Sequence, residues 1–226
     1  MSLDGHVEIS LPGSPVPMFP LQEVLLFPGQ ILPLHIFEPR YRQMVEDSLD
    51  GPGRIVMATI RPGMVAAAGS PPAVLPVAGI GEIVRHEKLP DGRFLVWLLG
   101  LQRVRIEEVA SDRLYRKVRC VPFEEVPVAA GESGDLCERL RAAAALRLPR
   151  KLQVPEQAGP GLLTDLLLQT LGAPQHFVAE IFSESNVAER ARMALAAAER
   201  FPPQPRTEDG TEGEGDGTHD TDRDET

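Results

Sequence analysis

Residues 16–41 read Val16-Pro-Met-Phe-Pro-Leu-Gln-Glu-Val-Leu-Leu-Phe-Pro-Gly-Gln-Ile-Leu-Pro-Leu-His-Ile-Phe-Glu-Pro-Arg-Tyr41, and this stretch constrains the fold more than any other in the 226-residue chain. Its five prolines fix φ and lack an N–H donor, so no long helix passes through it and its strands must be short or lie at a sheet edge. The apolar runs 24–27 and 31–37 predict two short buried strands. Phe27-Pro28-Gly29 predicts the turn that joins them.

A helix is predicted to follow directly. Pro39 suits the first helical position, where its missing N–H would be unpaired anyway, and Glu38 places a negative charge at the positive end of the helix dipole. Gly51 is expected to end this helix. Apolar side chains that recur at helical spacing share one face: Phe37, Tyr41, Met44, Val45 and Leu49.

The remainder of the first half predicts strands. Pro90-Asp91-Gly92 predicts a hairpin turn, and Gly100 permits a bend. Residues 94–99 are apolar at every position, which predicts a strand buried between two layers. Together with 31–37, the predicted strand regions are 24–27, 54–60, 74–89, 93–99, 103–107 and 115–123. We therefore expect an α+β fold with a bent, mostly antiparallel sheet of about six strands and one short helix, built as a small closed or half-closed barrel.

The composition changes after residue 130 and predicts helices. Asp135-Leu-Cys-Glu138 has the spacing of a helix capping box, and Ser185 is predicted to cap the last helix. Residues 202–226 hold nine acidic residues, two arginines and no hydrophobic residue, a net charge of −7. We expect four segments: a flexible arm (1–14), a β-rich barrel (15–127), a helical subdomain (128–201) and a disordered acidic tail (202–226).

The residues of the opening stretch resemble a known family. The pattern Met-Phe-Pro-Leu-x-x-Val-Leu-Phe-Pro-Gly-x-x-Leu-Pro-Leu-x-Ile-Phe-Glu-Pro-Arg-Tyr, present over residues 18–41 with one extra Leu, is similar to the N-terminal substrate-binding domain of Lon proteases. It resembles more closely still the stand-alone bacterial proteins that carry only this domain. Three further segments of this chain are similar to later strands of that domain and extend the resemblance to about residues 15–200. They are Gly79-Ile-Gly-Glu-Ile-Val-Arg-His86, Asp91-Gly-Arg-Phe94 and Gly100-Leu-Gln-Arg-Val-Arg-Ile106.

The resemblance implies both a fold and a function. Members of this family have a PUA-like pseudo-barrel, and they recognise unfolded or degron-bearing polypeptide. One form of this function is an adaptor in protein quality control that serves a separate protease or chaperone. In a groove between barrel and helices, the candidates for peptide contact are Phe37, Tyr41 and Trp97, although an aromatic residue of this kind is more often part of the core than a contact. The sequence leaves open whether the module forms a homodimer.

The motifs of an ATPase or a peptidase are missing from this sequence. It contains no phosphate-binding GxxxxGK(S/T) motif, and none of its lysines lies near a Gly-flanked Ser. Asp50-Gly51-Pro52-Gly53 resembles the nucleophile motif of Lon peptidases, but Gly53 stands where that motif has Ser. We therefore expect no enzymatic activity, no catalytic residue and no cofactor.

Metal, disulfide and membrane chemistry are not expected either. The five histidines show no paired spacing, and Cys120 and Cys137 are expected to be buried thiols. Residues 1–6 lack the basic and apolar regions of a signal peptide, and the longest uncharged run, 62–81, is broken by prolines and glycines. A cytoplasmic protein is therefore predicted.

RNA binding is the alternative function, because PUA-like folds elsewhere bind RNA. Acidic residues interrupt the basic cluster, and aromatic residues that could stack on bases are scarce, so nucleic acid is the less favoured partner. The basic residues concerned are Arg103, Arg105, Arg113, Arg116, Lys117 and Arg119.

Overall fold

The computed structural model describes residues 10–61, 71–148 and 154–203, and the fold belongs to the α+β class, as predicted. The strands of the described chain are β1 (Val16–Leu21), β2 (Ile31–Ile36), β3 (Arg54–Thr59), β4 (Val77–Lys88), β5 (Phe94–Val109) and β6 (Arg116–Pro122). The helices are α1 (Pro39–Leu49), α2 (Ala130–Ala145), α3 (Pro160–Gln169), α4 (Gln175–Phe182) and α5 (Val187–Arg200). Most of the predicted arm and nearly all of the predicted tail lie outside the described residues.

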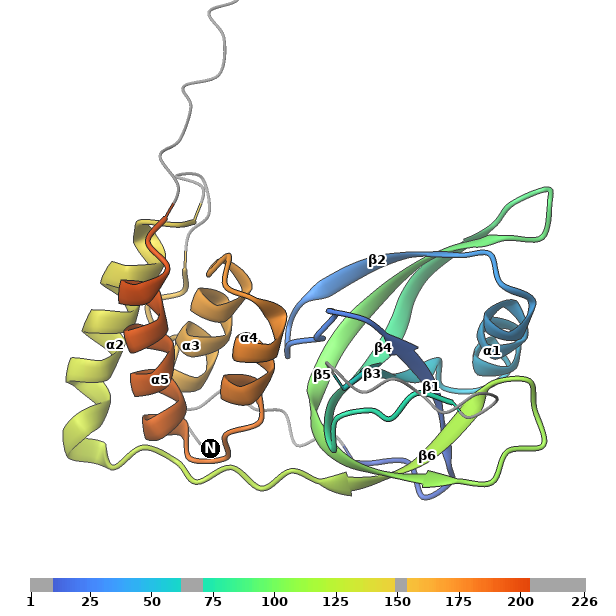
Figure 1. The fold of residues 1–226 in the computed structure, drawn as a ribbon, viewed down its shortest axis with the longest axis horizontal. Helices are drawn as coiled ribbons and strands as arrows, with labels where there is room; N and C mark the ends of the chain where they lie inside the picture. Colours follow the sequence, from blue (N-terminus) through green and yellow to red (C-terminus); the bar gives the residue numbers. More distant parts are fainter. Residues whose placement is uncertain (1–9, 62–70, 149–153, 204–226) are drawn as a thin grey trace, which may run out of the picture.

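The elements divide into two groups that lie at opposite ends of the molecule (Figure 1). The sheet part holds β1 to β6 with α1, and the helical part holds α2 to α5. The sheet order is β2-β5-β4-β3-β1-β6, and every neighbouring pair is antiparallel except the parallel pair β1 and β3. Because β5 also pairs with β6, the sheet closes on itself, and among the described residues one side of β2 is left without a neighbouring strand.

The predicted strand at 24–27 is wrong, and β1 supplies the missing strand instead. Residues 24–27 form an irregular segment whose side chains enter two different cores. Leu26 packs inside the sheet part, whereas Leu25 and Phe27 are buried against the helical part, where Phe27 meets Phe182 edge to face with ring centroids 5.1 Å apart. The segment therefore links the two parts, a role that an apolar run does not reveal. The predicted turn after it is confirmed.

Glycines in β4 and β5 allow this irregular segment to lie directly on the sheet. A Cβ atom on Gly79 would lie 2.2 Å from the carbonyl oxygen of Leu26, and one on Gly100 would lie 2.0 Å from that of Phe27. Backbone packs against backbone at both positions, so no side chain fits there. The Gly79 and Gly100 motifs noted in the sequence are thus required by this contact.

Strand β5 runs unbroken for 16 residues, so the predicted bend at Gly100 does not interrupt it. The predicted hairpin before it is confirmed, because the Gly92 N–H donates to the Leu89 carbonyl at 2.9 Å and Gly92 has a φ of 82°. Along residues 94–99, however, only alternate side chains are fully buried. The expectation of a strand covered on both faces is therefore wrong.

The helices confirm the predicted pattern with two corrections. Helix α1 begins at Pro39 and ends at Leu49 with Asp50 as its C-cap, so Gly51 follows the cap as predicted. The N–H groups of Gly51 and Gly53 both donate to the Ser48 carbonyl, at 3.2 and 3.0 Å. Helix α2 begins five residues before the predicted capping box at Asp135, so that box is not used. The last helix is capped by Asn186 rather than Ser185, since the Asn186 side chain accepts from the Glu189 N–H at 3.1 Å.

A buried ion network joins the sheet part to the helical part. Arg103 of β5 donates to both carboxylate oxygens of Asp165 in α3, at 3.0 and 3.2 Å, and to Glu125. Arg190 of α5 completes the network through Glu125 at 2.8 Å. Burial raises the pKa of Asp165, and the facing Arg103 opposes that rise. The four charges sum to zero, which is the condition under which buried ions are tolerated.

Candidate binding surface

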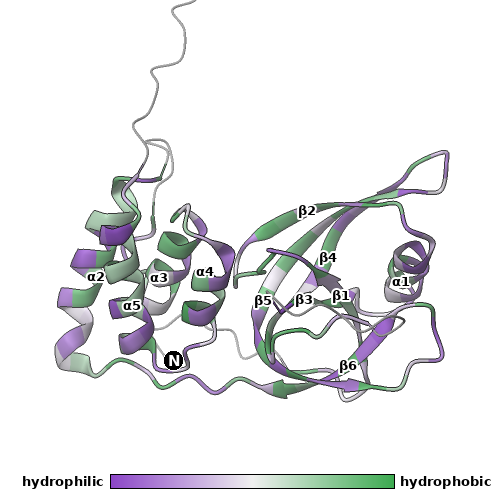
Figure 2. Ribbon diagram, in the orientation of Figure 1, coloured by the Kyte–Doolittle hydropathy of each residue, from purple (hydrophilic) through white to green (hydrophobic). Residues whose placement is uncertain are grey.

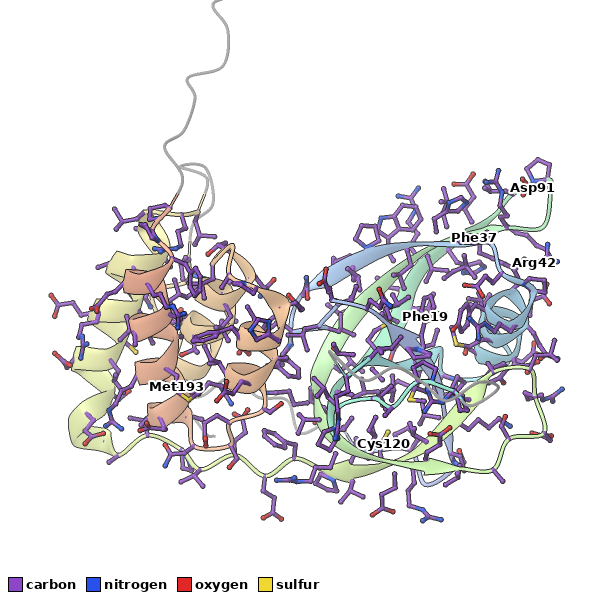
Figure 3. All side chains as sticks on the ribbon, in the orientation of Figure 1. Phe19, Phe37, Arg42, Asp91, Cys120 and Met193 are labelled. Carbon is purple, nitrogen blue, oxygen red and sulfur yellow. The ribbon has the colours of Figure 1, made fainter. Side chains whose placement is uncertain are left out.

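Strand β2 presents an apolar row of side chains away from the core. Its even-numbered residues pack inward, while Ile31, Pro33 and His35 are exposed on the opposite side. Phe37 continues this row just beyond the strand and is 61% exposed, and its ring centroid lies 6.0 Å from that of His35. Figure 3 shows Phe37 at the outside of the sheet part, where β2 leads into α1, with Phe19 inside. Figure 2 shows that β2 is largely hydrophobic.

Strand β5 extends this row into a surface. The register places Leu99 beside Ile31, Trp97 beside Pro33 and Leu95 beside His35, and cross-strand neighbours in a sheet share one face. These three β5 side chains are half-buried. We call the surface the outer face: Ile31, Pro33, His35, Phe37, Leu95, Trp97 and Leu99.

Strand β4 borders the outer face with polar groups. Arg85 is paired with Trp97, and its guanidinium carbon lies 4.6 Å from the centre of the Trp97 ring. Glu87 is paired with Leu95. Val84 lies at an irregularity in the β4–β5 pairing and is 50% exposed. The border therefore contributes one charge of each sign beside an apolar centre, a composition typical of surfaces that bind other proteins.

Two of the three aromatic candidates from the sequence lie on the outer face. Phe37 is exposed and Trp97 is half-buried beneath Arg85. Tyr41 instead lies in the core, 5% exposed, with its ring 4.3 Å from that of Phe19. Burial raises the pKa of the Tyr41 hydroxyl. The aromatic ring of Tyr41 is thus on the other side of the sheet from the outer face.

The aliphatic members of the outer face escaped the sequence analysis. Ile31 lies in the apolar run 31–34, and Leu95 and Leu99 lie in the apolar run 94–99, a pattern that predicts burial on both sides. Among the described residues, the helical part covers another region of the sheet part, so this face has no second layer. A binding surface of this kind is therefore recognised when a strand is apolar on both faces but the fold supplies a covering layer for only one of them.

The basic cluster considered for RNA binding is occupied by contacts within the chain. Arg103 belongs to the buried ion network, and Arg105 lies over the ring of Phe123. The other four basic residues of the cluster each contact an acidic side chain: Arg113 with Asp47, Arg116 with Glu108, Lys117 with Asp112 and Arg119 with Glu107. Phosphate binding would have to compete with these acids, so the arrangement disfavours the RNA alternative.

The described residues hold no cluster of metal-ligating side chains, and the Asp50-Gly51-Pro52-Gly53 segment holds no nucleophile at Gly53. Within ranges 10–61, 71–148 and 154–203, no three His, Cys, Asp or Glu side chains gather as a metal site. Asp50-Gly51-Pro52-Gly53 forms the turn after α1, and Gly53 has a φ of 69°. None of the helices in these ranges has the length and apolar character needed to span a bilayer.

Solved structures place the fold in a known class. The N-terminal domain of a Lon protease from the Mycobacterium avium complex aligns with a TM-score of 0.62 at 13% identity, covering 82% of this chain and 98% of that one. A Lon N-terminal domain protein from Xanthomonas campestris aligns with a TM-score of 0.59 at 21% identity, covering 81% and 98%. The fold is thus similar to that of Lon N-terminal domains.

The family follows from the sequence match. The family model described as the ATP-dependent protease La (LON) substrate-binding domain matches residues 15–200, and this chain belongs to that family. Lon protease 2 of Bdellovibrio bacteriovorus is 25% identical over 211 residues, which cover 88% of this chain and 26% of that protein. Lon protease 2 of Sorangium cellulosum is 28% identical over 196 residues, covering 82% and 24%. The chain therefore spans about a quarter of the length of these relatives.

Proposed function

We propose that this chain is a non-enzymatic module that binds unfolded or degron-bearing polypeptide through its outer face. The observation that carries the proposal is the apolar, uncovered surface around Ile31, Phe37 and Trp97 in a member of a substrate-binding family. A separate protease or chaperone would then act on the bound polypeptide, which makes the chain a cytoplasmic adaptor. The pairing of β5 with β6 supports classing 15–127 as a PUA-like pseudo-barrel, with 128–201 as a helical subdomain.

The exposed apolar area is large enough to support useful affinity. An aromatic side chain buries about 150–250 Å² when fully covered, so the 61% exposed part of Phe37 corresponds to roughly 90–150 Å². At about 25 cal/mol per Å², covering it contributes about 2–4 kcal/mol. Ile31, which is 57% exposed, adds a smaller amount. Such a gain must offset the cost of ordering the peptide, so we expect binding in the micromolar range.

Fluorescence anisotropy with a labelled, permanently unfolded protein tests the proposal. Reduced, carboxymethylated lactalbumin serves as the probe, with native lactalbumin for comparison. The parent chain is expected to bind the unfolded form alone, and Phe37→Ala and Trp97→Ala are each expected to weaken binding at least fivefold. Leu114→Ala is the matched control, because Leu114 is 68% exposed but lies in the loop between β5 and β6, which Figure 1 shows apart from β2. Equal affinity for the two forms of lactalbumin would reject the proposal.

A further inference from the structure

The free side of β2 carries a pattern of backbone groups that identifies how a polypeptide is held. In an antiparallel pair, residues alternate between those bonded to the neighbouring strand and those whose N–H and C=O point away from it. The Gly100 N–H donates to the Gln30 carbonyl at 2.8 Å, so Gln30 is bonded to β5. The alternation then directs the backbone groups of Ile31, Pro33 and His35 away from β5.

Proline at position 33 agrees with this assignment. Pro33 is paired with Trp97 and has no N–H to donate, and proline within a sheet occurs where the missing donor would face away from the neighbouring strand. In the described part of the chain, β2 pairs with β5 alone. The free side therefore offers two donors, from Ile31 and His35, and three acceptors, from Ile31, Pro33 and His35.

Natural edge strands are usually protected against strand addition by charged side chains. Here residues 30–37 contain no Asp, Glu, Lys or Arg. The nearest β4 neighbours on the outer face are Arg85 and Glu87, one charge of each sign. This balance suits an uncharged partner and disfavours the chain's own residues 202–226, which carry a net charge of −7. Within residues 30–37, only Pro33 hinders the addition of a strand, because it lacks one N–H donor.

We propose that β2 binds an extended, uncharged segment of unfolded polypeptide as an added β-strand. The segment bonds to the free backbone groups of Ile31, Pro33 and His35, and its alternate side chains lie beside those three residues on the outer face. An added strand thereby continues the cross-strand rows that already hold Trp97 and Leu95. This inference rests on the proposed function and specifies its binding mode: backbone hydrogen bonds give affinity without a fixed sequence, and alternate apolar side chains give preference.

Two double variants separate the backbone from the side chains. Ile31→Pro with His35→Pro removes both outward donors but no bond to β5, whereas Ile31→Ala with His35→Ala removes the same side chains and keeps the donors. The probe is a fluorescein-labelled peptide of alternating Thr and Val with one terminal Lys and one terminal Glu. Losing two hydrogen bonds of ordinary strength predicts at least fivefold weaker binding by the proline variant than by the alanine variant. Equal affinities would overturn the inference.

Peptide N-methylation gives a second test that needs no variant and therefore holds even if the proline variant misfolds. Methylating every second amide of the probe blocks either the amides that face β2 or those that face solvent. One methylated series is expected to lose binding at least tenfold, and the other is expected to stay within about twofold of the parent peptide. Equal effects of the two series would contradict strand addition.

The outcomes also distinguish this inference from the proposed function. If the parent chain fails to bind unfolded lactalbumin, the proposed function fails. If it binds unfolded lactalbumin and both methylated series equally well, only the strand-addition mode fails. Sedimentation velocity tests whether a second copy of the chain binds the β2 edge instead. Self-association of the parent chain that the proline variant abolishes would assign this edge to a dimer and overturn the inference.

Discussion

The replacement of Asp165 by Asn tests whether the buried ion network holds the two parts of the molecule together. Arg103 and Asp165 have side chains only 2% and 3% exposed, and two hydrogen bonds of 3.0 and 3.2 Å join them. Asn keeps the volume, so no cavity forms, but the network changes from neutral to a charge of +1. The amide nitrogen also faces an Arg103 donor. Breaking one partner of a buried pair costs about 3–5 kcal/mol, and the lower end applies because Asn still accepts one hydrogen bond.

Urea unfolding followed by circular dichroism measures this cost. With an m value of about 2 kcal/mol per M, a loss of about 3 kcal/mol lowers the midpoint by about 1.5 M. Asp135→Asn is the control, because its pair with Arg139 spans 3.6 Å with both side chains more than half exposed and is expected to change stability by less than about 0.5 kcal/mol. A fall of under 1 kcal/mol for Asp165→Asn would refute the reasoning.

A double variant refines that result. Arg103→Met leaves the buried network with a net charge of −1 and Asp165→Leu leaves it with +1, so each alone is expected to be strongly destabilising. The combination removes both charges and leaves Arg190 paired with Glu125 at 2.8 Å, a neutral remainder. The double variant is therefore expected to be more stable than either single one. Strictly additive losses would mean that the two side chains do not interact.

Three further expectations follow from packing and burial. Gly100→Ala would place a methyl group 2.0 Å from a carbonyl oxygen and should lower the free energy of unfolding in urea by at least about 3 kcal/mol. Gly131→Ala, which has open space around it in α2, should raise that free energy by about 0.5–1 kcal/mol, and similar effects of the two variants would contradict the packing. Burial raises the pKa of Cys120 to about 11, so at pH 8 iodoacetamide should label the half-buried Cys137 first, and labelling of Cys120 in the native protein should rise steeply only above pH 10; faster labelling of Cys120 at pH 8 would refute this. Trp97→Ala should cost only about 1–2 kcal/mol because its ring is half-buried, and a loss of 3–5 kcal/mol would place it in the core.

Much of the fold could be predicted because it rests on local chemistry. Pro39 and Gly51 mark the two ends of α1, and the Pro90-Asp91-Gly92 turn fixes the β4–β5 hairpin, through constraints that act within a few residues. The predicted strand at 24–27 was wrong because a run of apolar residues indicates that the side chains are buried but not which core they enter. Leu26 and its neighbours enter different cores, which only the contact between the two parts of the molecule decides.

The ion network could not be predicted for a related reason. Arg103 and Arg105 stand at alternate positions of β5 with Val104 between them, and nothing near them in the sequence distinguishes the buried Arg103 from Arg105, which lies over Phe123. Its partner Asp165 is 62 residues away, in a helix whose sequence is mostly apolar. A charged side chain is buried only when a distant partner of opposite charge is buried with it, so the assignment requires the tertiary structure.

The outer face shows how the same ambiguity bears on function. Residues 31–34 of β2 and 94–99 of β5 are apolar on both sides, and a sheet buries such residues fully only when both of its faces are covered. The helical part takes up a different set of apolar residues, including Leu25, Phe27 and Phe123, and is held in place by the network at Arg103. Its position is therefore fixed away from the outer face among the described residues. On the proposed function, a bound polypeptide covers Ile31 and Phe37, and the outward backbone groups of β2 favour one in extended form.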